Sequence, residues 1–403
     1  MRKARFAVLG GALAAVVALG LVFRPKAGEG AEDVSVPAPG EVLLDRAAAE
    51  GRGASAAELR RLRAADKGDE AALARAVAAA KRSIEASRKT GDPRHLGHAE
   101  AALAPWWSDA DAPAEVLVLR ATIEQSRHDF PAALADLDRA LQKRPDDAQA
   151  WLTRAVVLTV RADYKEAERS CAAARPHVAP LVHDVCVAGV LGSTGKAREA
   201  IGRIDAALAR PARVPKDLVA WAAGAAGELR ARLGEAAAAE ADYKRALDLT
   251  PDDAYVLGAY ADLLLDAGRP REAAALLAAH EDNDGLLLRV VLAKAAAGDP
   301  DHARVKAELA SRYEASRLRG DVVHRREEAR WALHGEKAPK RALDLARANW
   351  DVQKEPADAR ILLESALAAS EPRAADPVIA WLEASGAEDV ALRKLAAEVK
   401  ARP

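Results

Sequence analysis

Residues that could bind a metal or form a disulfide gather in one short stretch of the chain. Cys171, His177, His183 and Cys186 follow one another with the spacing C-x5-H-x5-H-x2-C. Thiolate and imidazole groups are the ligands that zinc prefers, although this spacing matches no common zinc pattern. The two cysteines could instead form a disulfide or remain as small buried thiols. These residues alone leave all three interpretations open.

No segment carries a recognised catalytic motif. The sequence contains no G-x-S-x-G, no H-E-x-x-H and no G-x-x-x-x-G-K. The segment Gly192–Lys196 (GSTGK) resembles a phosphate-binding loop faintly, but it follows an expected helix rather than a strand, so we interpret it as a turn. The charged segment His324–Arg330 could bind an anion, but pairing between residues four apart favours a solvated helix face. We therefore predict no enzymatic activity and no cofactor.

Small residues recur in pairs along the chain, and this repetition predicts the elements that must position those side chains. In each pair an alanine or glycine is followed by an alanine twelve positions later. The pairs begin 34, 33, 39 and 34 residues apart, a period typical of stacked structural repeats. The pairs are Ala121 and Ala133, Ala155 and Ala167, Ala188 and Ala200, Gly227 and Ala239, and Ala261 and Ala273.

One repeat shows the physical basis of the pattern. Trp151 and Ala155 fall at helical spacing, a break follows, and Tyr164 and Ala167 begin a second helical pattern. Small residues allow the two helix axes to approach closely where they cross. Proline followed by two aspartates, as at Pro145, ends one helix and caps the next. The turn inside the repeat often carries glycine, at positions that suit a positive φ: Gly195, Gly234 and Gly268.

The pattern Trp151, Ala155, Tyr164, Ala167 and Ala174 resembles the tetratricopeptide repeat. This resemblance implies an all-α, right-handed superhelical solenoid of helix-turn-helix units. It covers roughly four fifths of the chain and places the solenoid within 41–403. The clearest repeats are 114–147, 148–180, 181–219, 220–253 and 254–283, and degenerate repeats occupy 69–108 and 284–400.

Two further segments, His324–Leu333 and Asn349–Arg360, resemble a group of uncharacterised exported bacterial repeat proteins. That group has no assigned activity that could be transferred to this chain.

The composition agrees with a helical fold, because 50% of the residues are apolar but only 4% are aromatic. The 60 basic and 61 acidic residues balance, which gives no indication of a nucleic-acid partner.

The N-terminus indicates the compartment. Three basic residues, Arg2, Lys3 and Arg5, precede the apolar run Phe6–Phe23. Its 18 residues lie between a signal-peptide core and a membrane-spanning helix, so we predict that 1–23 is a signal peptide or an N-terminal membrane anchor, and we favour the anchor. Residues 24–40 then form a flexible linker.

Either reading predicts an exported, periplasmic protein, which contacts the inner membrane through its N-terminal segment if that segment is not cleaved. In an oxidising compartment, a cysteine pair on consecutive helices favours a disulfide between Cys171 and Cys186.

The tetratricopeptide resemblance also implies where a partner binds. In that family the first helix of each repeat lines a concave groove. The matching positions here supply exposed aromatic anchors and exposed charges for an extended peptide or a partner helix: Gln125, Gln149, Trp221, Glu228, Arg232, Tyr255, Asp262 and Asp266. We therefore expect an exported interaction protein that binds a peptide or protein, as an envelope assembly or scaffold factor. The alternative is a metal-handling or carrier module that uses Cys171, His177, His183 and Cys186.

Overall fold

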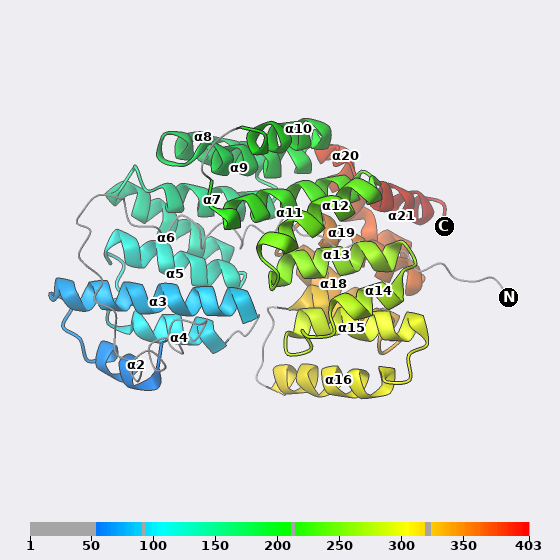
Figure 1. The fold of residues 1–403 in the computed structure, drawn as a ribbon, viewed down its shortest axis with the longest axis horizontal. Coiled ribbons are helices and arrows are strands. Elements are labelled where there is room, and N and C mark those ends of the chain that lie inside the picture. The colour runs from blue at the N-terminus through cyan, green and yellow to red at the C-terminus, as the bar shows by residue number, and fades with distance from the viewer. Residues whose placement is uncertain (1–53, 91–93, 211–213, 319–323, 403) are drawn as a thin grey trace. The chain divides into compact units, whose positions relative to one another are not determined.

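The computed structural model describes residues 54–90, 94–210, 214–318 and 324–402 (Figure 1). All regular elements in these residues are helices, and these residues contain no strand. The all-α prediction is therefore confirmed. The predicted signal peptide or anchor (1–23) and linker (24–40) lie outside the described residues.

The chain divides into two compact units with a boundary inside helix α7. Among the described residues, the N-terminal unit covers 54–153 and the C-terminal unit covers 154–402. The N-terminal unit contains α2 (Ala56–Arg63), α3 (Glu70–Thr90), α4 (Arg94–Ala102), the 3-10 helix η2 (Ala104–Trp106), α5 (Ala114–Ser126), α6 (Phe130–Lys143) and the first part of α7 (Ala148–Val160). The C-terminal unit continues with α8 (Tyr164–Ala174), η3 (Arg175–His177), α9 (Pro180–Ser193), α10 (Ala197–Leu208), α11 (Lys216–Arg232), α12 (Ala236–Leu249), α13 (Ala254–Asp266), α14 (Pro270–Leu276), α15 (Asp284–Ala297), α16 (His302–Leu318), α17 (Arg325–His334), α18 (Pro339–Trp350), α19 (Pro356–Ala368), η4 (Pro372–Ala375), α20 (Asp376–Ser385) and α21 (Val390–Lys400).

Small residues set the distance between the two helices of a pair, as the sequence pattern predicts. The pair formed by α11 and α12 shows this at Gly227, where an added Cβ would lie 2.9 Å from the Tyr243 ring and 3.2 Å from the carbonyl oxygen of Ala239. Ala155 and Ala167, the corresponding pair in an earlier repeat, are both buried. The pattern of alanine and glycine therefore marks close helix crossings.

Local backbone signals also follow the sequence. Gly195, Gly234 and Gly268 all take left-handed conformations, with φ of 75°, 80° and 71°. Ala162 occupies the same position in its own repeat, at φ 63°. Its Cβ makes this left-handed conformation less favourable than it would be for glycine. Asp253 accepts hydrogen bonds from two backbone amides at the start of α13, as expected for the aspartate that follows a proline-aspartate break.

The first helices of successive pairs in the C-terminal unit contact one another in order, from α9 through α11, α13, α15 and α17 to α19. This stack closes on itself, because its last helices return to its first ones. The amide of Lys354 donates to the carbonyl of Val160 at 2.8 Å, and the Trp381 indole donates to the Tyr164 hydroxyl at 2.9 Å. The amide of Ala197 donates to a carboxylate oxygen of Glu388 at 2.7 Å.

We call this junction, between Val160–Ala197 on one side and Lys354–Asp389 on the other, the seam. Within the seam, the backbone at Gly195 lies close to the backbone at Gly386, since an added Cβ at Gly195 would lie 2.8 Å from the carbonyl oxygen of Gly386. The seam brings together residues up to 217 positions apart in the sequence. As a result, the face formed by the first helices turns inward within the C-terminal unit.

Candidate functional site: the inner face of the C-terminal unit

The predicted ligand-binding charges of the C-terminal unit lie on that inner face, and the structure buries most of them. Glu228, Arg232 and Asp262 are only 1%, 3% and 0% exposed. The expectation that groove charges are open to solvent is therefore wrong at these positions. Trp221 and Tyr255, expected as exposed aromatics, are of intermediate exposure.

The cause of this burial is that the groove holds the last helices of the same chain. Asp262 on α13 accepts hydrogen bonds from two arginines of other repeats: Arg289 at 2.7 and 2.9 Å and Arg330 at 2.7 Å. Burial alone would raise the pKa of Asp262, but the charges of both guanidinium groups outweigh it and lower the pKa. Asp262 is thus an ionised, fully paired carboxylate.

One turn further along α13, Asp266 faces Arg360 on α19 at 3.2 Å. Arg360 also donates to Glu364 at 2.6 Å, and His334 lies 3.4 Å from the same carboxylate. Burial raises the pKa of Asp266 well above its ordinary value. Burial also acts on Glu364, but the charges of Arg360 and His334 lower its pKa to about 2. These contacts tie α13 to α17 and α19.

Glu228 and Arg232 occupy the last turns of α11, next to the start of α21. The Tyr255 hydroxyl donates to one carboxylate oxygen of Glu228, and Arg232 donates to the carbonyl of Gly192 at 2.5 Å. Arg232 also lies 3.9 Å from Asp389, the N-cap of α21. The second carboxylate oxygen of Glu228 is buried without a hydrogen-bond partner in the described residues, and burial raises the pKa of Glu228 to about 7.

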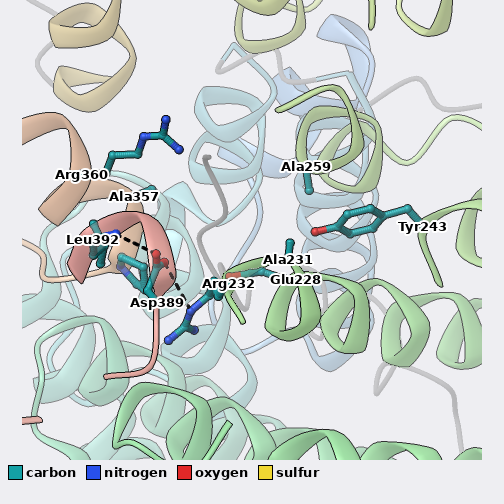
Figure 2. A pocket seen from close by; sticks show the side chains of 10 residues that line it. Glu228, Ala231, Arg232, Tyr243, Ala259, Ala357, Arg360, Asp389 and Leu392 are labelled. Atoms are coloured by element: carbon teal, nitrogen blue, oxygen red, sulfur yellow. Dashed lines mark hydrogen bonds and ion pairs between the residues drawn. The ribbon is translucent and has the colours of Figure 1, made fainter. Parts of the chain in front are cut away.

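A small cavity of about 10 Å³ lies among these groups, between α11, α13, α19 and α21. Figure 2 shows Arg232 and Asp389 facing each other at this point, with Glu228 beside Arg232. A cavity of this size holds about one water molecule. It is therefore too small to be a binding site for an organic ligand.

A second cluster of charged side chains lies where the start of α17 meets the end of α18 and the start of α19. Arg326 contacts three carboxylates: Glu327 at 3.1 Å, Glu355 at 3.2 Å and Asp358 at 3.4 Å. Burial tends to raise the pKa of Glu327, but Arg326 lowers it to about 2. The interpretation of segment 324–330 as a solvated face is therefore wrong at Arg326, whose side chain is only 23% exposed.

Asp358 accepts the largest number of hydrogen bonds in this cluster. Its donors are the side-chain amides of Asn349 at 2.8 Å and Gln353 at 2.9 Å, and the backbone amide of Glu355 at 2.9 Å. Sequence reasoning did not select these residues as a site. The available signal was that they lie in the two segments, 324–333 and 349–360, that resemble exported repeat proteins.

The predicted site residues of the N-terminal unit are also buried. Gln125 on α5 and Gln149 on α7 are 5% and 6% exposed. The Gln149 amide donates to the Thr153 hydroxyl at 3.1 Å. That any of the predicted positions binds a separate partner remains a prediction.

The cysteine and histidine stretch forms a covalent link rather than a set of free ligands. A disulfide joins Cys171 on α8 to Cys186 on α9, with Cα atoms 5.8 Å apart. The bridged sulfurs cannot serve as thiolate ligands. The part of the chain that the structure describes contains no group of three or more His, Cys, Asp or Glu residues that could hold a metal. The predicted set of four metal ligands thus loses its two cysteines.

The described residues include no helix with the length and apolar composition of a membrane span. No family model matches this sequence, and no curated protein matches it either.

Solved structures of low similarity include helical-repeat proteins. PilW, a type IV pilus biogenesis factor, is 21% identical over 50% of this chain and 94% of its own, with a TM-score of 0.40. A tetratricopeptide repeat protein from Parabacteroides merdae is 16% identical over 71% of this chain and 98% of its own, at 0.31. A Rap protein complexed with Competence and Sporulation Factor is 13% identical over 85% and 89%, at 0.43. These values are too low to support an argument about function.

Proposed function

We propose that this chain, a tetratricopeptide-type stack of helix pairs, is an exported, non-enzymatic protein that binds a peptide or protein partner through its first helices. Its role would be that of a scaffold or assembly factor in the cell envelope. One observation carries the proposal. The positions that the tetratricopeptide resemblance assigns to ligand binding hold another segment of the same chain by charged contacts.

Those contacts define the chemistry that a partner would have to offer. Arg232 faces the N-cap carboxylate of a helix, while Asp262 and Asp266 each face an arginine on the inner side of α17 and α19. A partner helix with an acidic first turn and arginines further along would repeat this pattern. Such a helix would compete with α19 and α21 for the inner face.

The disulfide and the sequence of the N-terminus support export. A bridge between Cys171 and Cys186 persists in an oxidising compartment and is rare in the cytosol. The basic residues and the apolar run Phe6–Phe23 have the composition of an export signal or membrane anchor. Fractionation of cells that express the full chain, with alkylation of free thiols before lysis, would test both points.

Site-specific photocrosslinking tests the binding face. A photoreactive amino acid replaces Trp221, a half-buried inner position, or Lys244, whose side chain is 59% exposed on the second helix α12. We expect a partner adduct of defined mass from position 221 and none from position 244. Adducts from position 244 alone would place the partner on the outer face. Absence of adducts from both positions, in cells where the chain is folded, would contradict a partner-binding role.

A further inference from the structure

Two acidic side chains, Glu355 within the seam of the C-terminal unit and Glu228 next to it on α11, lie in surroundings that disfavour their charge. Glu228 faces Arg232 on its own helix, Tyr255 on α13, Arg326 on α17 and Asp389 ahead of α21. Only the Tyr255 hydroxyl donates a hydrogen bond to it, and its other carboxylate oxygen points into the buried region without a hydrogen-bond partner among the described residues. An ionised carboxylate there would have at most the one water molecule that the small cavity can hold to solvate this oxygen.

Glu355, just ahead of α19, has a similar difficulty for a different reason. The groups that face it are Asp358, Arg326 and Glu228. Arg326 is one cation shared by three carboxylates, and Glu327 and Asp358 are the better satisfied anions. Asp358 has three amide donors in addition, whereas Glu355 has the shared guanidinium and the backbone amide of Asp358, its partner in a capping box. A proton on Glu355 would remove the excess negative charge.

Both residues lie beside contacts that close the unit. Glu355 follows Lys354, whose amide donates to Val160 across the seam. Glu228 lies one turn before Arg232 on α11, and Arg232 faces Asp389, which belongs to the seam. If α19 and α21 moved away from α11, water would reach both carboxyl groups and they would ionise. The open and closed states therefore bind different numbers of protons.

We propose that closure of the C-terminal unit is coupled to proton binding: Glu228 and Glu355 are neutral while the seam is closed, ionise when it opens, and so make the seam less stable as pH rises. The directions agree, because burial is the largest cause that raises the pKa of Glu228 to about 7 and that of Glu355 to about 8. An acid whose pKa is raised in the closed state stabilises that state fully below its ordinary pKa. It loses this contribution as pH rises to the raised value. The window therefore runs from about pH 5 to about pH 8.

Backbone hydrogen exchange of the full chain measures opening directly, without any partner. The amides of Ala197 and Lys354 are protected by hydrogen bonds across the seam, whereas amides in the middle of α13 are protected by the helix itself. We expect the protection factors of the two seam amides, relative to α13, to fall about tenfold per pH unit for each titrating group between pH 5 and 7. They should level off near pH 8.

Glutamine variants identify the groups. Glu228→Gln with Glu355→Gln keeps both side chains neutral and should remove the part of the slope that these two groups cause. Burial also raises the pKa of Asp266, which faces Arg360 on α19, so Asp266→Asn in the same background should remove the remainder. If the double variant does not fold, each single variant should remove about half of the logarithmic slope that Glu228 and Glu355 cause. Glu124→Gln in the N-terminal unit is the matched control and should leave the slope at the seam unchanged.

Three results would overturn the proposal. The first is a seam whose protection does not change between pH 5 and 8 in the unaltered chain. The second is a slope in the glutamine variants that is as steep as in the unaltered chain. The third is a parallel loss of protection in α13, which would indicate unfolding of the whole unit rather than opening of the seam.

Discussion

Replacing Gly195 with alanine tests the seam with a single methyl group. Two costs are expected. A residue with a Cβ at φ 75° loses about 1–2 kcal/mol relative to glycine. The added methyl would also lie 2.8 Å from the carbonyl oxygen of Gly386 and 3.3 Å from its carbonyl carbon, and overpacking against fixed atoms costs about 1–3 kcal/mol.

Gly268→Ala is the matched control, because Gly268 has a similar φ of 71° and an added Cβ there would meet nothing within 4 Å. It should show the conformational cost alone. The excess destabilisation of Gly195→Ala over Gly268→Ala then reports the clash, and it cannot exceed the free energy of opening the seam, since opening relieves the clash. A small excess would therefore mean a seam that opens easily.

Urea unfolding at fixed pH gives the free energies of unfolding, and exchange at the Ala197 amide shows whether the seam opens instead. We expect Gly195→Ala to be less stable than Gly268→Ala by about 1–3 kcal/mol, or to lose protection at Ala197 while α13 stays protected. Equal stabilities together with equal protection at Ala197 would refute the close approach of Gly195 to Gly386, and with it the seam.

Three further outcomes are expected. Reduction of the bridge between Cys171 and Cys186, which are 15 residues apart, should lower the free energy of unfolding by up to ~3 kcal/mol; two alkylatable thiols in the unfolded, non-reduced chain would exclude the bridge. Asp262→Asn should cost about 3–5 kcal/mol in urea unfolding, because it leaves two partly buried arginines without their buried carboxylate. Glu383→Gln, which removes only an exposed pair with Lys400, should stay within about 0.5 kcal/mol, and similar effects of the two changes would contradict the buried pairing. Burial raises the pKa of Glu124 to about 7. Between pH 5 and pH 8 the free energy of unfolding of the native chain should therefore fall more than that of Glu124→Gln, by at most ~3 kcal/mol. Parallel pH profiles of the two proteins would show that Glu124 does not titrate in this range.

The repeat architecture could be predicted because its signals are local. The crossing of Gly227 with Ala239 joins residues twelve positions apart, and the turn at Gly268 depends on one backbone angle. The two cysteines could be paired in advance for the same reason, since consecutive helices carry them. Each of these features involves residues that lie within about one structural unit, so a pattern in the sequence can predict it.

Closure of the C-terminal unit could not be predicted in this way. Asp262 meets Arg330 from 68 positions away, Asp266 meets Arg360 from 94, and Ala197 meets Glu388 from 191. A charged residue on a helix face is usually solvated, and nothing near Asp262 in the sequence marks the distant arginine that buries it. The sequence therefore predicts the charged side chains of the inner face, but not the segment that occupies it.

The seam also bears on the order in which the chain folds. Contacts within a repeat form early because little chain entropy is lost in closing them, whereas contacts such as that between Tyr164 and Trp381 bring together residues 217 positions apart. The earlier repeats must therefore exist for a time with their inner face uncovered. Because that face carries Glu228, Arg232 and Asp262 rather than a continuous apolar surface, water can solvate it until the last helices arrive. A polar inner face thus protects the half-folded stack from aggregation, at the cost of a slow final step that joins the two ends of the unit.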